Sequence, residues 1–261
     1  MMPTFSLTHL HYTQLGSTTW CATAQVGEAL CSNFEALKEK TSWLLITYTP
    51  FIKLYAFKDL DWQYYGSSVP FSARKIAQRQ LQRRGVRLLL QRLLKKLEIK
   101  DTLDESNFPY RLVGSRYYVC FSHTGVSNNI GKSSDQTVNR QLKSNVAVTI
   151  SRHRPTGIDI ENSNIAWRVV QRYYSDNEIA TIQSLPAIQR HNIAKLLWQI
   201  KESFIKIHQY TLAQGLGKDY AYLVANLINS VKQQSNVIVI ADNQSHYHIA
   251  ILPIQQTVVV F

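Results

Sequence analysis

The sequences GIDIE at residues 157–161 and WQIKESFIK at residues 198–206 decide which fold this chain is expected to form. In the first, apolar residues alternate with Asp159 and Glu161, and residues two apart on a strand point to the same side. The second lies within residues 190–209, where apolar residues recur on one face of a helix. Those residues are Leu197, Ile200, Phe204 and Ile207. A strand end followed by a long amphipathic helix predicts a helix packed on a sheet.

The same outline is predicted on both sides of residue 150. In the first part, residues 72–96 have a helical pattern that Ser72 can cap, and its buried face contains Val86, Leu90, Leu93 and Leu97. Strands are predicted in this part at residues 42–49, 117–123 and 145–151, and the polar residues 126–144 are predicted to be an inserted loop. Strands are predicted in the second part at residues 222–227, 236–241, 246–252 and 257–261. The fold class is therefore α+β, with similar halves at residues 1–150 and 151–261, each a long helix packed on a mainly antiparallel sheet.

Composition narrows the class of protein. The chain has 261 residues, 45% of them hydrophobic and 18% charged, which is typical of a globular protein. No apolar run reaches the roughly 18 residues that a membrane span needs, and the first residues show no signal peptide. Three cysteines without metal-ligand spacing indicate free thiols. We therefore expect a cytoplasmic protein without a membrane anchor.

The positive charge of the chain predicts an anionic partner. The formal net charge is +12, and residues 71–100 contain ten of the 29 Lys and Arg residues. Arg79, Arg83 and Arg87 are four apart, so they line one stripe of the predicted helix. Nucleic acid, anionic lipid, a phosphorylated cofactor and an acidic protein are all attracted by such a field.

The acidic residues of the two opening stretches suggest a metal site. Two carboxylates on the same side of a strand repel each other unless a cation lies between them. Mg²⁺ fits, because it takes a few carboxylates and completes its coordination with water and phosphate oxygens. Glu202 is a candidate third ligand, and Lys206 lies one helical turn further on the same face. Either fragment alone is also common on solvated surfaces, so the motifs have to be considered together.

Four motifs in order resemble those of the Sfp-type 4′-phosphopantetheinyl transferases. GIDIE at residues 157–161 and WQIKESFIK at residues 198–206 match the family's G-[IV]-D-[IVL]-E and W-x-x-K-E-[SA]-x-x-K motifs completely. YYSDNE at residues 173–178 is similar to its F-F-[ST]-x-x-E motif, and FSHTG at residues 121–125 to its N-[IL]-S-H-[ST] motif. The resemblance covers about residues 72–210, and it implies a fold whose two halves are related by a pseudo-twofold axis.

The resemblance also implies a reaction and its residues. Members of this family transfer the phosphopantetheine arm of coenzyme A to a serine of an apo acyl or peptidyl carrier protein and release 3′,5′-ADP. It implies that Asp159, Glu161 and Glu202 bind Mg²⁺ and that Lys206 meets the phosphates. Glu178 matches the residue proposed to take the serine proton, with Glu202 or a water molecule on the metal as alternatives. The catalytic set is thus Glu178, Glu202 and Lys206, in the second half.

Coenzyme A contacts are implied mainly in the first half. Ser122 and His123 match phosphate contacts, and Lys201 matches a lysine that approaches the phosphates or supports the site. Arg87 is the best match to the family's basic helix residue, with Arg79 and Arg83 close behind. The family's G-K-P lysine has no counterpart at residues 107–111. A monomer is expected, because a chain of two halves can close its own site. An acidic carrier protein is expected as partner, because the chain is basic.

Two other function classes compete with the transferase. A Mg²⁺-dependent nuclease or phosphodiesterase would also use acids, a lysine and a basic face. A binding protein that has lost its chemistry is the third hypothesis, although Asp159, Glu161, Glu202 and Lys206 are all present. The four motifs favour the transferase, and they give no reason to expect nucleic acid as a partner.

Overall fold

The computed structural model describes residues 5–28, 73–125, 143–231, 233 and 235–261. The strands are β1 (Phe5–Gly16), β2 (Thr19–Glu28), β3 (Leu103–Asp104), β4 (Tyr110–Leu112), β5 (Tyr118–Gly125), β6 (Lys143–Ser151), β7 (Gly157–Ile160), β8 (Ile238–Asp242), β9 (Tyr247–Leu252) and β10 (Thr257–Val260). The helices are α1 (Ala73–Lys96), α2 (Trp167–Tyr173), α3 (Asp176–Ser184), α4 (Ala187–His208), α5 (Leu212–Leu216), the 3₁₀ turn η1 (Ala221–Leu223) and α6 (Val224–Val231). The chain is thus an α+β protein, as predicted.

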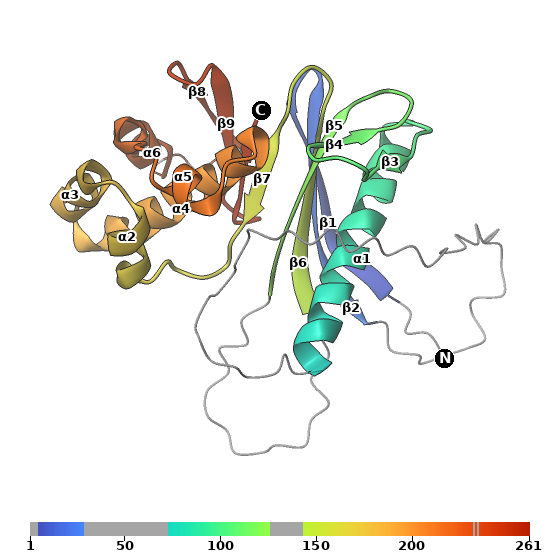
Figure 1. Ribbon diagram of the computed structural model, residues 1–261, viewed down its shortest axis with the longest axis horizontal. Helices are drawn as coiled ribbons and strands as arrows, with labels where there is room; N and C mark the ends of the chain where they lie inside the picture. The colour runs from blue at the N-terminus through green and yellow to red at the C-terminus, as the bar shows by residue number, and fades with distance from the viewer. Residues whose placement is uncertain (1–4, 29–72, 126–142, 232, 234) are drawn as a thin grey trace.

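The N-terminal sheet has six strands in the order β1-β2-β6-β5-β4-β3, and its neighbours are all antiparallel. Helix α1 crosses one face of this sheet, as Figure 1 shows, and contacts β2 and β6 most extensively. Its apolar stripe closes a core with the inward side chains of these strands, including Leu89, Leu93, Val26 and Val148. Burial of this stripe stabilises the helix more than its intrinsic propensity does.

The C-terminal sheet has four antiparallel strands in the order β7-β10-β9-β8. Helix α4 packs on β7 and β10, and Figure 1 shows the other helices of this half grouped beside it. Its buried face includes Leu197, Ile200 and Phe204, which pack with residues from α6, β9 and β10. The predicted buried face of this helix is confirmed.

Both sheets contain a segment with the same connectivity. In the first, the chain passes through β2, α1, β4, β5 and β6 in this order, with β3 between α1 and β4, and the four strands lie in the order β2-β6-β5-β4. In the second, it passes through β7, α4, β8, β9 and β10 in this order, with short helices on either side of α4, and the four strands lie in the order β7-β10-β9-β8. Each segment is a strand, a long helix and three antiparallel strands, with the last strand beside the first. The first half adds β1 and β3 at its edges, and the second adds short helices.

The two sheets meet along β5, β6 and β7. A separate apolar cluster fills this junction and includes Cys120 and Ala147 from the first sheet and Ile158, Ile160 and Val259 from the second. Because these side chains are almost fully buried, the junction excludes water and holds the end of β7 against β5.

Most predicted elements agree with the structure, but one strand prediction is wrong. Residues 222–227 belong to η1 and α6, not to a strand. Their apolar run is short and fits either structure by periodicity, and the buried residues Val224, Leu227 and Ser230 are three apart, which is helical spacing. The hairpin of β1 and β2 had not been predicted. The predicted strand at residues 42–49, the cap Ser72 and residues 126–142 of the predicted loop lie outside the described residues.

Gly157 allows β7 to approach the backbone of α4 closely. A Cβ atom added at this position would lie 2.1 Å from the carbonyl oxygen of Ser203, which is too close for any side chain. The motif glycine is therefore needed for close packing between strand and helix.

We expect Gly157→Ala to lower the free energy of unfolding by about 1–3 kcal/mol, because the strand and the helix must separate. Urea unfolding measures this change. Gly125→Ala is the matched control, since a Cβ there meets no atom within 4 Å. Equal stability of the two variants would contradict the close-packing role.

Candidate active site

The polar stripe of α4 faces β7 instead of solvent. The sequence places Lys195, Gln199, Glu202 and Lys206 opposite the apolar face of the helix. In the structure Gln199 is buried, and its Nε2 donates to the carbonyl oxygens of Asp159, at 3.3 Å, and of Gln256, at 2.8 Å. The stripe thus supplies hydrogen bonds to the backbone of β7 and of the turn before β10.

Lys206 joins the helix to the end of β7. Its Nζ donates to the carbonyl oxygen of Ile158 at 2.7 Å and to Oδ1 of Asp159 at 3.1 Å. The Lys206 side chain keeps 22% of its surface exposed, whereas the Asp159 side chain keeps 9%. Although burial opposes it, the charges of Asp159 and Glu202 raise the pKa of Lys206. The ammonium is therefore charged at neutral pH and can still be reached by a ligand.

The three predicted carboxylates lie close enough to interact. Burial, then the charges of Asp159 and Glu161, raise the pKa of Glu202 to about 7, and Lys206 opposes this shift. Burial and the charge of Asp159 also raise the pKa of Glu161. The carboxylate of Glu161 accepts a hydrogen bond from the backbone nitrogen of Ser163 at 2.8 Å. Three carboxylates that disfavour one another's charge form a site that attracts a cation.

Strand β5 of the N-terminal sheet completes the site from the other half. Ser122 is buried; its Oγ donates to Oδ1 of Asp159 at 3.0 Å and accepts from the backbone nitrogen of Ile160 at 3.2 Å. Ser122 thus holds the Asp159 carboxylate in place. Its neighbour His123 is exposed, and the surrounding protein and the charge of Lys206 lower its pKa.

The predicted arginines of α1 lie in different surroundings. Arg83 is exposed, and its charge contributes to the lowered pKa of His123, which places it near the site. Arg87 forms an ion pair with Glu105, with Nε donating to Oε1 at 2.7 Å. Arg79 is exposed one turn before Arg83. Basic groups from α1, β5 and α4 therefore border the carboxylates.

The comparison with known families agrees with the motifs. Residues 155–257 match the model of the 4′-phosphopantetheinyl transferase superfamily. This part of the chain is a domain of that superfamily. The match spans less than half of the 261 residues and includes β7, α4 and all three carboxylates. No curated protein matches the chain.

Members of the 4′-phosphopantetheinyl transferase superfamily take their transferred group from coenzyme A, and Mg²⁺ is the metal that the resemblance implies. Asp159, Glu161 and Glu202 offer carboxylate oxygens, which are the ligands that this hard cation prefers. Their combined negative charge also favours a divalent cation. Among the residues described, no three Asp, Glu, His or Cys side chains are already close enough to enclose an ion. The metal assignment therefore stays a prediction supported by the chemistry of the donors.

Glu178 and Lys201 lie together, but not among these carboxylates. Both side chains are completely buried, and Lys201 Nζ lies 2.8 Å from Glu178 Oε2. Neither side chain is open to a ligand in this arrangement. Their predicted contacts with the serine proton and with phosphate remain predictions.

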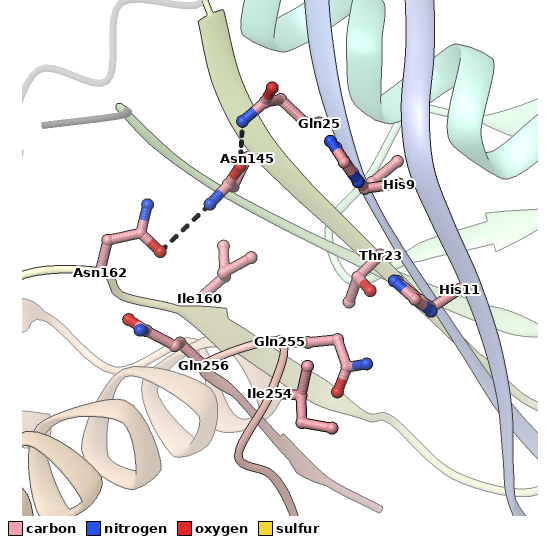
Figure 2. A pocket seen from close by; sticks show the side chains of 11 residues that line it. His9, His11, Thr23, Gln25, Asn145, Ile160, Asn162, Ile254, Gln255 and Gln256 are labelled. Atoms are coloured by element: carbon pink, nitrogen blue, oxygen red, sulfur yellow. Dashed lines mark hydrogen bonds between the residues drawn. The ribbon is translucent and has the colours of Figure 1, made fainter. Parts of the chain in front are cut away.

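Figure 2 shows a pocket that is partly lined by Ile160 of β7, which sequence reasoning did not find. Ile160 lies between Asp159 and Glu161, so it points to the opposite side of the strand and lines the pocket. A chain of amides borders it: Gln25 Nε2 donates to Asn145 Oδ1 at 3.4 Å, and Asn145 Nδ2 donates to Asn162 Oδ1 at 3.2 Å. These amides come from distant segments, and no sequence motif brings them together.

Glu202 gives the metal-free protein a testable pH dependence. Its folded pKa of about 7 is above the usual value, so its contribution to stability is present below about pH 4.5 and is lost as pH rises through 7. The facing charges are Asp159 on β7, Glu161 directly after β7 and Lys206 on α4. Mg²⁺ should therefore raise the Tm more at pH 8 than at pH 5, by on the order of 2–4 °C.

Thermal unfolding with and without Mg²⁺ at the two pH values measures this difference. In Glu202→Gln the charge is absent, so both the pH dependence and the effect of Mg²⁺ should shrink. An equal response to Mg²⁺ in the wild type and in this variant would show that Glu202 is not a ligand.

Proposed function

We propose that this protein transfers the 4′-phosphopantetheine arm of coenzyme A to a serine of an apo acyl or peptidyl carrier protein and releases 3′,5′-ADP. The observation that carries the proposal is the junction of β7 and α4. There Asp159, Glu161 and Glu202 interact beside the partly exposed ammonium of Lys206. The superfamily domain covers this junction, and exposed basic groups of the N-terminal half lie next to it.

The proposed chemistry is an in-line displacement at phosphorus. The serine oxygen forms a bond to the β-phosphorus while the bond from that phosphorus to the bridging oxygen breaks, so negative charge builds on the departing phosphate. Lys206 would neutralise this charge, because its ammonium is charged and accessible. Mg²⁺, when bound by the carboxylates, would act as a Lewis acid on the phosphate oxygens.

Glu202 is proposed to accept the serine proton, because its carboxylate is partly exposed at the site whereas that of Glu178 is buried. Glu178, the residue matched by sequence, has both carboxylate oxygens occupied in a fully buried ion pair. Glu178 is therefore the weaker candidate for this role.

The two halves are proposed to divide the work. Residues 1–150 would hold the phosphates of coenzyme A through His123 and the α1 arginines, and residues 151–261 would hold Mg²⁺ and perform the transfer. The shared connectivity of the two sheets supports a pseudo-twofold relation between the halves. Ser122 is better suited to orienting Asp159 than to meeting a phosphate, because it is buried and bonded to that carboxylate.

An acidic carrier protein fits the net charge of +12. A monomer is proposed, because one chain contains both the basic groups and the carboxylates of the site. A cytoplasmic location is proposed because Cys21 and Cys120 are free thiols. No helix in the part of the chain that the structure describes has the length and apolar character needed to cross a membrane. The basic face is also compatible with nucleic acid, but the superfamily match favours coenzyme A.

Incubation of apo-carrier protein with coenzyme A and Mg²⁺ tests the proposal. The carrier should gain the mass of phosphopantetheine, and Asp159→Ala should lower kcat/KM by roughly 10²–10³-fold. Asp176→Ala is the control, since it removes an exposed carboxylate outside the site. No mass gain over a range of carriers, together with Mg²⁺-dependent cleavage of DNA, would replace the transferase with a nuclease.

A comparison of two arginines tests the coenzyme A side. Arg83→Ala should raise the KM for coenzyme A about 10-fold with little change in kcat, because a contact remote from the reacting atoms contributes uniform binding. Arg87→Ala should have a smaller effect, since Arg87 already pairs with Glu105. Steady-state kinetics measures both. A larger effect at Arg87 would mean that coenzyme A displaces Glu105 from it.

A further inference from the structure

The ion pair of Glu178 and Lys201 is the most deeply buried pair of charges in the described residues. Both side chains have an exposed fraction of 0%, and they join α3 to α4. Removing two charges from water is costly, so a pair this deep persists only with full hydrogen bonding. The surroundings of the pair show whether it is available to a substrate.

Every hydrogen-bonding position of Lys201 is occupied. An ammonium has three donors. They reach Oε2 of Glu178 at 2.8 Å, the carbonyl oxygen of Leu216 at 2.6 Å and the carbonyl oxygen of Lys218. The rings of Tyr174 and Tyr220 lie beside the ammonium, with centroids 5.1 and 5.4 Å away. No donor is left for a phosphate.

Glu178 is equally occupied. Its Oε2 also accepts from the backbone nitrogen of Ser175 at 2.9 Å, which is one half of the capping box at the start of α3. Its Oε1 accepts from the backbone nitrogen of Tyr220 at 3.0 Å. Three backbone segments therefore converge on one pair of side chains: the first turn of α3, the middle of α4 and residues 216–220.

The pair lies next to the proposed site along the chain but points elsewhere. Lys201 directly precedes Glu202, and successive helical residues point about 100° apart. When Lys201 is fixed toward α3 and residues 216–220, the rotation of α4 is fixed too. Glu202 and Lys206 are then held toward β7. Close packing of α5 against α4 also limits the rotation of α4, because a Cβ at Gly215 of α5 would lie 2.0 Å from the side chain of Ile205 on α4.

We propose that Glu178 and Lys201 are positioning residues for the transfer reaction: together they fix the rotation of α4, and neither touches coenzyme A or the carrier serine. The inference rests on the proposed function for its effect on activity. It assigns a different role from the one that the motifs suggest for these two residues. Removing one charge leaves the other buried and unpaired, so removing both should be less harmful than removing one.

A double-mutant cycle tests this. Glu178→Gln and Lys201→Met each leave one buried charge unpaired, so each should lower kcat for carrier modification at least 10-fold and lower the Tm. The double variant removes both charges at similar volume. It should regain at least half of the lost Tm and bring kcat to within about 5-fold of the wild type, with the KM for coenzyme A unchanged. Glu98→Gln and Lys100→Met are the controls, because both residues are exposed.

The outcomes separate the alternatives. A double variant that regains its Tm but stays as inactive as Glu178→Gln would overturn the proposal, because the carboxylate would then be needed for chemistry. If neither single variant folds, comparing kcat of the double variant with that of the wild type still decides whether the Glu178 carboxylate is needed for chemistry. If the wild type modifies no carrier, the proposed function fails, while the Tm cycle and the Mg²⁺-induced rise in Tm still test the positioning role. Additive Tm changes would show that the two charges do not depend on each other.

Discussion

The contact between the end of β7 and the middle of α4 is the constraint on which the site depends. Gly157 brings the strand to the helix backbone, and Lys206 then reaches both a carbonyl oxygen of β7 and the Asp159 carboxylate. Because the backbones of β7 and α4 lie so close, the polar side chains of α4 face the strand and need hydrogen-bonding or charged partners on it. Gln199 does so through the backbone, whereas Glu202 meets other carboxylates and acquires a raised pKa. The chemistry of the site thus follows from how closely two backbones pack.

Two lysines of one motif illustrate how strongly environment separates similar side chains. Lys201 and Lys206 are five residues apart on α4 and therefore point in different directions. Lys201 is completely buried and satisfied by Glu178 and two carbonyl oxygens, which suits a structural role. Lys206 has a carboxylate partner but keeps an accessible surface, which suits the binding of an anionic substrate. A pattern of residue types cannot distinguish these two states.

The N-terminal half contributes to the same site through a few specific contacts. Ser122 on β5 donates a hydrogen bond to Asp159 on β7 and orients it. Asn145 on β6 donates a hydrogen bond to Asn162, which lies just after β7. The Ser122–Asp159 hydrogen bond is buried, and a hydrogen bond shielded from water is stronger. The position of the carboxylates is therefore set by both halves, although all three belong to the second.

The sequence by itself determined the α+β class, the long helices, most strands and the carboxylates with Lys206, because periodicity and motif order are local properties. It did not find the β1–β2 hairpin, and it predicted a strand where α6 forms, since short apolar segments fit either structure. Only the tertiary structure decided that Ser122 binds Asp159, that Glu178 pairs with Lys201 and that amides from β2, β6 and the segment after β7 meet. These contacts join residues that are distant in the chain. Burial and charge compensation are properties of the packed molecule, so no spacing in the sequence specifies them.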